Sequence, residues 1–265
     1  MKRVLVLSDL HCGHATGLTP PDWMHKVQSR SSSSAIRRRN KFTELQTQMW
    51  KWYTSQLSDI GKVDICMVMG DCVDGGGQRS GGTELIEVDT NKQAEIAIEC
   101  LTEVKAKKHV MVYGTPYHTG DGSDVEDLIA QEMDAKIGGH EWVDVNGVIF
   151  DLKHKIGSSG IPHGRGTAIM KEKLWSQLWE QDGDQPRADI LLRGHVHYHT
   201  YVGGPEWLGM TCPALQGMGT KYGSRQCSGL VHFGLVVFEV SEKGDYTWQS
   251  RIARLEGQKA HALKL

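Results

Sequence analysis

Short, unbroken apolar runs recur along the chain, and each has about the length of a buried strand. After the basic start Met1-Lys2-Arg3, the first run is Val4-Leu5-Val6-Leu7. Branched and aliphatic residues with no alternating polar positions are typical of a strand that is covered on both faces. The pattern predicts five such strands, which cover residues 4–7, 63–69, 110–113, 148–152 and 190–192.

Segments with helical spacing separate several of these runs. Asn40 is expected to cap a helix whose apolar face consists of Phe42, Leu45, Met49, Trp52, Tyr53 and Leu57. Further helices are predicted over 91–107, 123–136 and 167–181, and in the last of these Leu174, Trp175 and Leu178 are expected to point inward. A strand, a helix and a second strand in succession imply a parallel pair with a right-handed crossover.

The second half of the chain changes to antiparallel signals. Asn146-Gly147 separates the strand-like segments 141–145 and 148–153, and this dipeptide is the strongest short hairpin signal. Beyond His199, alternating segments at 201–202, 207–211, 230–240 and 246–255 suggest further antiparallel strands. We therefore expect an α/β fold of two packed mixed β-sheets flanked by helices.

Length and composition favour one large domain. The chain has 265 residues, a formal net charge of -2 and no internal repeat or linker, so we expect a single domain over 1–265. A loop-like insertion is expected at about 13–39, which contains a serine-rich stretch and Arg37-Arg38-Arg39. This insertion is either a solvated surface loop or a mobile basic flap that meets a phosphate backbone.

Charge and cysteine usage restrict the cellular setting. The near-neutral balance argues against binding of nucleic acid through bulk positive charge. The first apolar run is interrupted by Asp9, which is too early for a signal peptide, and no run is long enough to span a membrane. The six cysteines form no C-x-x-C pair and lie mostly in apolar contexts, which suggests a reducing cytoplasm.

Each of the five predicted strands ends close to a side chain that can bind a metal. Asp9 and His11 follow the first strand two residues apart and point the same way. The other four strands are followed by Asp71, His118, His154 and the pair His195 and His197. Carboxylates and imidazoles delivered to the open end of an α/β sheet are ligands for a divalent transition metal.

The order of these motifs resembles the calcineurin-like metallophosphoesterases. Asp-x-His, Gly-Asp-x-x-Asp, Gly-x-x-x-His, a lone His and Gly-His-x-His follow one another between Val4 and about His199. The resemblance implies the same two-sheet sandwich and a pair of metal ions that activate a bridging water as the nucleophile for phosphoester hydrolysis. It also implies that Asp71, which follows a glycine, bridges the two ions.

The resemblance also implies how the remaining ligands are divided between the two ions. Asp9, His11 and His197 are expected around one ion, and His154 and His195 are expected to join Asp71 on the other. Manganese is favoured, with iron and zinc as alternatives to it, because at least four imidazoles are proposed and magnesium prefers oxygen and water. Asp74 is expected to orient a ligand or to fix the glycine turn.

The third motif departs from the family. The usual motif is Gly-Asn-His followed by an acid. Here Thr115 stands in the Asn position and His118 comes three residues later. Similar Gly-Thr-x-x-His text is found in phage-type members of the family. His118 is expected to be the general acid at the leaving oxygen, or else a ligand that replaces the missing Asn.

Four further residues are candidates for contact with the substrate. His163 and Arg165 follow the fourth motif, His14 follows the first, and Arg193 precedes the fifth. His163 also competes with His154 as the fourth ligand, and His154 is preferred because it lies directly at a strand end. For His14 a supporting or solvent-facing role remains open.

The expected function is hydrolysis of a phosphodiester in DNA, RNA or a nucleotide. The Asn-His pair of the protein phosphatases is absent, and the arginine-rich segment offers a surface for a phosphate backbone. One alternative is a phosphomonoesterase acting on a protein or a small molecule. A second is a scaffold that has kept the fold and lost the chemistry, for which the altered third motif would be the evidence.

Overall fold

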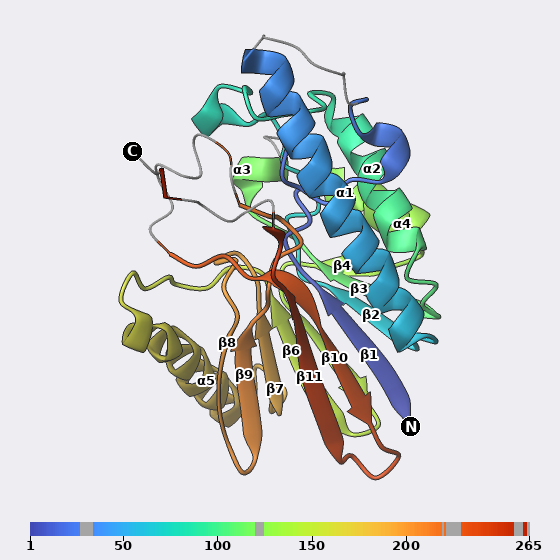
Figure 1. The fold of residues 1–265 in the computed structure, drawn as a ribbon. Coiled ribbons are helices and arrows are strands. Elements are labelled where there is room, and N and C mark those ends of the chain that lie inside the picture. The colour runs from blue at the N-terminus through green and yellow to red at the C-terminus, as the bar shows by residue number, and fades with distance from the viewer. Residues whose placement is uncertain (27–33, 120–124, 219, 221–228, 257–261, 264–265) are drawn as a thin grey trace.

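The computed structural model describes residues 1–26, 34–119, 125–218, 220, 229–256 and 262–263. Within them the chain forms two mixed β-sheets that pack face to face, with helices on both outer faces (Figure 1). This confirms the fold class expected from the sequence.

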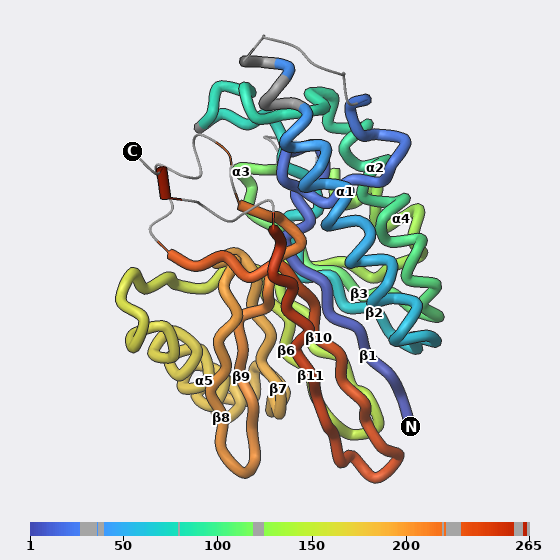
Figure 2. Tube along the Cα trace, in the orientation of Figure 1, coloured from blue at the N-terminus to red at the C-terminus, as the bar shows by residue number. Residues whose placement is uncertain are grey.

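The first sheet has six strands in the order β11-β10-β1-β2-β3-β4. Strands β1 to β4 are parallel to one another. Next to β1 lie β10 and then β11, two strands from the end of the chain, and each is antiparallel to its neighbour. Strands β1 and β10 therefore lie side by side although they are far apart in sequence (Figure 2). The strand bounds are Lys2–Leu7, Ile65–Val68, Lys108–Val112, Lys136–Gly138, Phe233–Val240 (β10) and Tyr246–Ala253 (β11).

The second sheet has five strands in the order β5-β6-β7-β9-β8. Its three central strands are parallel, and each edge strand is antiparallel to its neighbour. The bounds of β5 to β9 are Glu141–Val145, Val148–Lys153, Ile190–Arg193, Thr200–Gly204 and Trp207–Thr211. The β5–β6 hairpin turns at Asn146 and Gly147, whose φ angles of 54° and 88° are those of the predicted tight turn.

Helices α1, α2 and α4 cover the outer face of the six-stranded sheet, and α5 covers the five-stranded sheet (Figure 1). The α-helices α1 to α5 span Ser34–Ile60, Thr90–Thr102, Pro116–Thr119, Val125–Glu132 and Arg165–Asp182. Three short 3-10 helices, η1 to η3, span Pro21–Trp23, Gln78–Ser80 and Pro162–Gly164. No helix in the described part of the chain has the length and apolar character to cross a membrane.

The alternation of side chains along β1 divides the core into two layers. Leu5 and Leu7 pack under the helices, while Val4 and Val6 point into the space between the sheets. Phe150 of β6 meets Phe238 of β10 across that space, with ring centroids 5.2 Å apart. Burial on both faces is the reason that the strand sequence contains no polar positions.

Several predicted boundaries are corrected by the structure. Helix α1 begins at Ser34, six residues before the cap predicted at Asn40. Helix α4 ends at Glu132, before the predicted end at 136, because residues 136–138 extend the first sheet as β4. The predicted start of this helix at 123 lies outside the described residues. Of the expected insertion, residues 13–20 are buried and 34–39 belong to α1, while 27–33 lie outside the described residues.

The orientation predicted for α5 is wrong. Leu174, Trp175 and Leu178 are exposed, and the side chains turned toward the sheet are Ile169, Lys173 and Ser176. The Lys173 ammonium donates a hydrogen bond of 2.8 Å to the carbonyl oxygen of Ala188 at the start of the chain leading into β7. The helix thus packs Ile169, Lys173 and Ser176 inward and turns its larger apolar face outward.

Candidate metal centre

The loops that follow the central strands of both sheets meet at one place. The backbone N–H of Asp9 donates to the carbonyl of Gly70 at 3.1 Å, which joins the loops after β1 and β2. The backbone N–H of His195 donates to the Asp9 carboxylate at 3.1 Å, which joins the first sheet to the loop after β7. Carboxyl ends of parallel strands therefore gather the candidate ligands, as the sequence predicted.

The backbone at the candidate ligands has an uncommon conformation. Among the described residues other than glycine, eight have positive φ, and five of these are candidate metal ligands. The five, with φ between 47° and 72°, are Asp9, His11, Asp71, His195 and His197. Such backbone is uncommon for residues with a side chain, and its concentration here is typical of a functional site.

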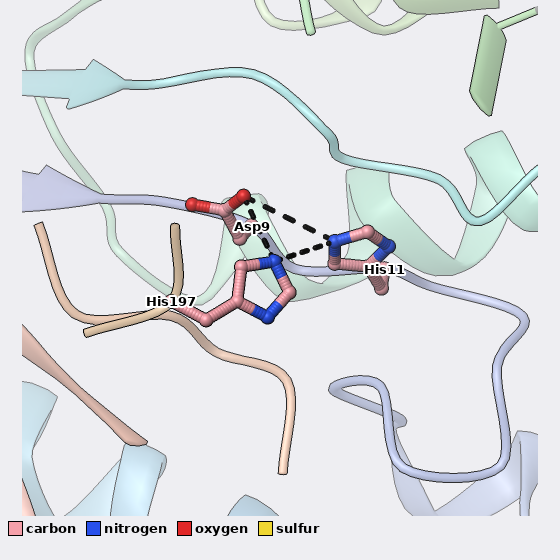
Figure 3. Close-up of side chains that lie close together, drawn as sticks. All are labelled: Asp9, His11 and His197. Atoms are coloured by element: carbon pink, nitrogen blue, oxygen red, sulfur yellow. Dashed lines mark hydrogen bonds and ion pairs between the residues drawn. The ribbon is translucent and has the colours of Figure 1, made fainter. Parts of the chain in front are cut away.

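The first ligand group consists of Asp9, His11 and His197 (Figure 3). His197 Nε2 lies 3.2 Å from an oxygen of Asp9 and 3.2 Å from His11 Nε2. One ligand atom from each of the three residues lies within 4.8 Å of the others. This is the set expected around one ion.

The second group consists of Asp71, His154 and His195. His154 Nε2 lies 3.0 Å from Asp71 Oδ2, and the same oxygen lies 4.0 Å from His11 Nε2 of the first group. Asp71 Oδ2 is thus placed between the two groups, where a bridging carboxylate has to be.

Hydrogen bonds fix the rings of two ligands so that Nε2 faces the centre. His154 Nδ1 lies 2.6 Å from the carbonyl oxygen of Met69, which accepts only, so the proton of the neutral ring is on Nδ1. His11 Nδ1 lies 3.0 Å from the carboxylate of Asp74, the orienting contact expected for that residue. Both rings then present the Nε2 lone pair, as metal-binding histidines do.

The electrostatics of the centre couple the carboxylates to the imidazoles. Burial alone would raise the pKa of Asp9, but His197 and His154 lower it to about 2. Burial lowers the pKa of His11 to about 4. For His154 the effect of burial is outweighed by the Asp71 and Asp9 carboxylates, which raise its pKa to about 9. A metal cation would take the place of the proton that the two carboxylates otherwise attract to the His154 ring.

The donor set fits a pair of divalent transition metals. Two carboxylates and four imidazoles converge, and Asp9, His11, Asp71 and His154 are almost fully buried. His154 Nε2 is buried and lies 3.0 Å from the Asp71 carboxylate, and in the neutral ring that donates from Nδ1 to Met69 it carries a lone pair. A lone pair and a carboxylate that face each other in a buried site are costly unless a cation binds between them.

Thr115 and His118 of the third motif make different contacts around the centre. The Thr115 hydroxyl donates to the Asp71 carboxylate at 2.8 Å, and its backbone N–H donates to the other Asp71 oxygen at 2.6 Å. His118 Nδ1 lies 2.9 Å from the carbonyl oxygen of Asp74, and His118 Nε2 lies 3.9 Å from Asp71 Oδ2. Thr115 therefore orients the predicted bridge, and His118 is the side chain of this motif that faces the centre.

Two buried side chains that the sequence analysis did not single out support these loops. Glu126 of α4 accepts hydrogen bonds from the backbone N–H of Cys72 at 2.9 Å and of Gly114 at 2.6 Å. Gln93 of α2 accepts from the N–H of Gly75 at 2.8 Å and donates to its carbonyl oxygen at 3.0 Å. Both lie on helices with ordinary polar and apolar spacing, so no local pattern distinguishes them from surface residues.

Glycine is required where the loops touch. A Cβ atom on Gly114 would lie 2.2 Å from the Asp71 carboxylate, and one on Gly194 would lie 2.7 Å from Ser8 and 3.0 Å from His154. Any side chain at these positions would push apart the loops that carry the ligands.

The predicted substrate contacts have different positions. His14 is buried, with Nε2 3.5 Å from the Glu84 carboxylate, and His163 is exposed in η3. The guanidinium of Arg165 lies over the ring of Tyr198, 4.2 Å from its centroid, and Tyr198 directly follows His197. Arg165 thus contacts the residue next to His197, and the backbone N–H of His14 donates to the carbonyl oxygen of His11 at 3.1 Å.

Arg193 has a structural position in place of the substrate contact predicted for it. Its side chain is 2% exposed and forms ion pairs with Asp151 at 2.7 Å and Glu172 at 3.0 Å. The guanidinium also donates to the carbonyl oxygens of Asp151 and Leu192. These bonds tie β6, β7 and α5 together and turn the guanidinium away from the ligands.

No family model and no curated protein matches the chain. Among solved structures, the chain is similar to a Vps29 from Entamoeba histolytica, with 13% identity and a TM-score of 0.44 over 95% of this chain and 99% of that one. An archaeal phosphodiesterase has 11% identity and a TM-score of 0.44 over 94% and 99%. Vps29 from Chaetomium thermophilum has 11% identity and a TM-score of 0.45 over 95% and 98%.

Structural similarity at this low sequence identity and TM-score does not assign a function. The two-sheet sandwich and the strand-end positions of the motif residues are nevertheless those implied by the resemblance to calcineurin-like metallophosphoesterases. A function has to be inferred from the chemistry of the site itself.

Proposed function

We propose that this protein is a dimetal-dependent phosphoester hydrolase whose preferred substrates are phosphodiesters. One observation carries the proposal: two groups of ligand atoms, Asp9 with His11 and His197, and Asp71 with His154 and His195, lie side by side around one Asp71 oxygen. When bound, two divalent ions supply positive charge for the phosphoryl oxygens and lower the pKa of a water molecule.

The chain's own residues hold and orient this centre. Asp71 supplies the shared oxygen, and the hydrogen bonds from Thr115 keep its carboxylate in one orientation. Asp74 and the Met69 carbonyl keep the rings of His11 and His154 turned inward. Such supporting hydrogen bonds normally change metal affinity or activity 10-fold to 100-fold when they are removed.

His118 is proposed to donate a proton to the leaving oxygen. Its Nδ1 bond to the Asp74 carbonyl leaves Nε2 directed at the centre, on the side of His11, whose ring centroid lies 4.7 Å away. In the doubly protonated ring, Nε2–H is then the donor available to a substrate. A positioned general acid contributes about 10²-fold to 10⁴-fold in rate.

The preference for a diester rests on the changed third motif and on one basic side chain, Arg165, whose guanidinium lies over the ring of Tyr198, the residue after His197. We expect this guanidinium to bind a phosphate group that follows the scissile one. The predicted flap side chains Arg37, Arg38 and Arg39 lie outside the described residues, so their contribution stays a prediction. DNA, RNA and nucleotides are the substrate classes that offer such a second contact.

Metal-depleted protein reconstituted with manganese tests the proposal. Its rates on bis-p-nitrophenyl phosphate and p-nitrophenyl phosphate are compared, and we expect the diester to be hydrolysed faster. A large preference for the monoester would favour the phosphomonoesterase alternative instead.

Metal analysis separates an enzyme from a scaffold. We expect up to two equivalents of manganese, iron or zinc in the purified protein, because the imidazole ligands favour these ions over magnesium. A protein that contains no stoichiometric transition metal and cannot be reconstituted would be a scaffold of the same fold. Activity restored by magnesium alone would contradict the histidine ligands.

A further inference from the structure

Helix α5 lies on the outside of the molecule (Figure 1). Its outward face carries an apolar stripe. Met170, Leu174, Trp175, Leu178 and Trp179 are 56%, 55%, 50%, 41% and 42% exposed. They recur at three- and four-residue spacing, so they form one continuous face, which we call the α5 stripe. The helix contacts β7, β8 and β9 with its other side.

Helix α5 already packs a different set of residues against the sheet, so the stripe is not the face that belongs in the core. Ile169, Lys173 and Ser176 are buried against the five-stranded sheet, and Lys173 is bonded to the Ala188 carbonyl there. Gly209 of β9 leaves no room for more, since a Cβ atom on it would lie 2.4 Å from Ile169. The sheet is therefore already packed, and within the described part of the chain the large side chains of the stripe remain exposed.

The exposed area of the stripe matches one half of an interface. With roughly 200 Å² for a fully exposed large side chain, the five residues expose about 500 Å². This is near the upper limit for the largest apolar patch of a typical monomer, and such patches mark interaction sites. Two stripes with their polar margins would reach the roughly 1,200 Å² at which stable interfaces begin.

The charges at the two ends of the stripe favour an antiparallel copy of the same helix. Lys171 and Asp182 are exposed, lie on the same face of α5 as the stripe, and are about 16 Å apart along the axis, too far for an ion pair within one helix. Neither forms an ion pair with another described residue. Two helices packed antiparallel about a two-fold axis would place Lys171 of each copy beside Asp182 of the other.

The same register pairs the apolar residues. With Lys171 opposite Asp182, Leu174 faces Trp179 and Trp175 faces Leu178, so large side chains meet large side chains across a self-complementary patch. Tryptophan at the centre of an interface is typical of residues that contribute most to affinity.

We propose that the α5 stripe is a self-association surface, on which α5 of a second copy of this chain packs antiparallel to form a two-fold symmetric dimer. The dimer leaves the metal centre free, because α5 lies on the outer face of the sheet whose opposite face packs against the first sheet. This inference does not depend on the proposed phosphoesterase activity.

Sedimentation velocity of the full chain tests the proposal. We expect a species of twice 29.5 kDa that dissociates on dilution. The substitution Trp175→Glu should raise the dissociation constant at least about 30-fold, because a charge would be buried at the centre of the interface. The matched control is Val88→Glu, which charges an apolar side chain that is 73% exposed outside α5 and should leave the dimer unchanged.

A charge exchange tests the antiparallel register. Lys171→Glu alone should weaken association, and the double variant Lys171→Glu with Asp182→Lys should restore it, since each new charge would again face its opposite in the other copy. Circular dichroism confirms that each variant is folded. A wild-type chain that stays monomeric at all concentrations, a Trp175→Glu variant that remains dimeric, or a charge exchange without recovery would each overturn the proposal.

Discussion

Five of the candidate ligands hold a backbone conformation that costs energy. A left-handed φ costs of order 1–3 kcal/mol for a residue with a side chain, and Asp9, His11, Asp71, His195 and His197 all have one. The cost is offset by hydrogen bonds between the loops, such as His11 N–H to the Asp71 carbonyl at 3.0 Å. The left-handed turns bring the ligands of three short loops to one place, two each from the loops after β1 and β7 and one from the loop after β2.

Asp71→Asn should remove metal and activity together. The shared carboxylate oxygen supplies charge to both groups of ligands, and an amide of the same size supplies none. We expect metal content measured by mass spectrometry to fall and the rate to drop more than about 100-fold. Full metal occupancy in a folded Asp71→Asn protein would contradict the bridging role.

His118→Ala should leave the metals in place. Its Nε2 lies 3.9 Å from Asp71 Oδ2 and is proposed to meet only the leaving oxygen. We expect a loss of about 10²-fold to 10⁴-fold in rate, and a smaller loss for esters whose leaving group needs no proton. If this variant instead empties one metal position, His118 replaces the missing Asn as a ligand.

The candidate ligands were predictable because each of them lies within a few residues of the end of an apolar run. Asp9, Asp71 and His154 stand where a strand ends, and the ends of parallel strands share one edge of a sheet. Arg193 stands in the same kind of position, yet its side chain turns to Asp151 and Glu172. Sequence spacing identifies the end of a strand but not the tertiary partner of a long side chain.

At the scale of elements, the helices behind the first sheet hold the metal loops in register. Glu126 of α4 bonds to the loops after β2 and β3, and Gln93 of α2 bonds to the loop after Asp74. Glu126 is fully buried, so both of its oxygens depend on these backbone donors. Helices that appear only to cover the sheet thereby position the ligands.

Glu126→Gln should weaken metal binding without removing a ligand. Its NH2 group would face a backbone N–H where the carboxylate now accepts, which leaves one buried donor unsatisfied at about 1–3 kcal/mol. We expect metal affinity to fall about 10-fold to 100-fold in a calorimetric titration. The control is Glu132→Gln at the exposed end of α4, and equal effects of the two changes would contradict the positioning role.

The elements differ in how far the sequence predicted them. The central strands followed from their apolar runs, and the β5–β6 hairpin followed from Asn146-Gly147, because burial and turn geometry act locally. The side of α5 that faces the sheet did not follow, because spacing shows which residues share a face but not what that face meets. The residues predicted to face the sheet, Leu174, Trp175 and Leu178, are instead part of the exposed α5 stripe.

At the scale of the whole molecule, the metal centre joins the two sheets at their common end. Asp9, His11 and Asp71 come from the six-stranded sheet, and His154, His195 and His197 come from the five-stranded sheet. Below them the sheets are held by apolar contacts such as Phe150 with Phe238. Each ligand group draws on both sheets, so bound metal would restrain their relative position.

Chelation should therefore lower the stability of the entire fold. A ligand that binds only the folded state at 100 times its dissociation constant adds about 2.7 kcal/mol, and each kcal/mol shifts the midpoint of a domain of this size by about 2–4 °C. We expect EDTA to lower the thermal midpoint of the metal-loaded protein by about 5–10 °C, in one cooperative transition seen by both far- and near-UV circular dichroism. The Asp71→Asn protein, which should already lack metal, is the control and should respond little. An unchanged midpoint after proven loss of metal would mean that the ions do not hold the two sheets together.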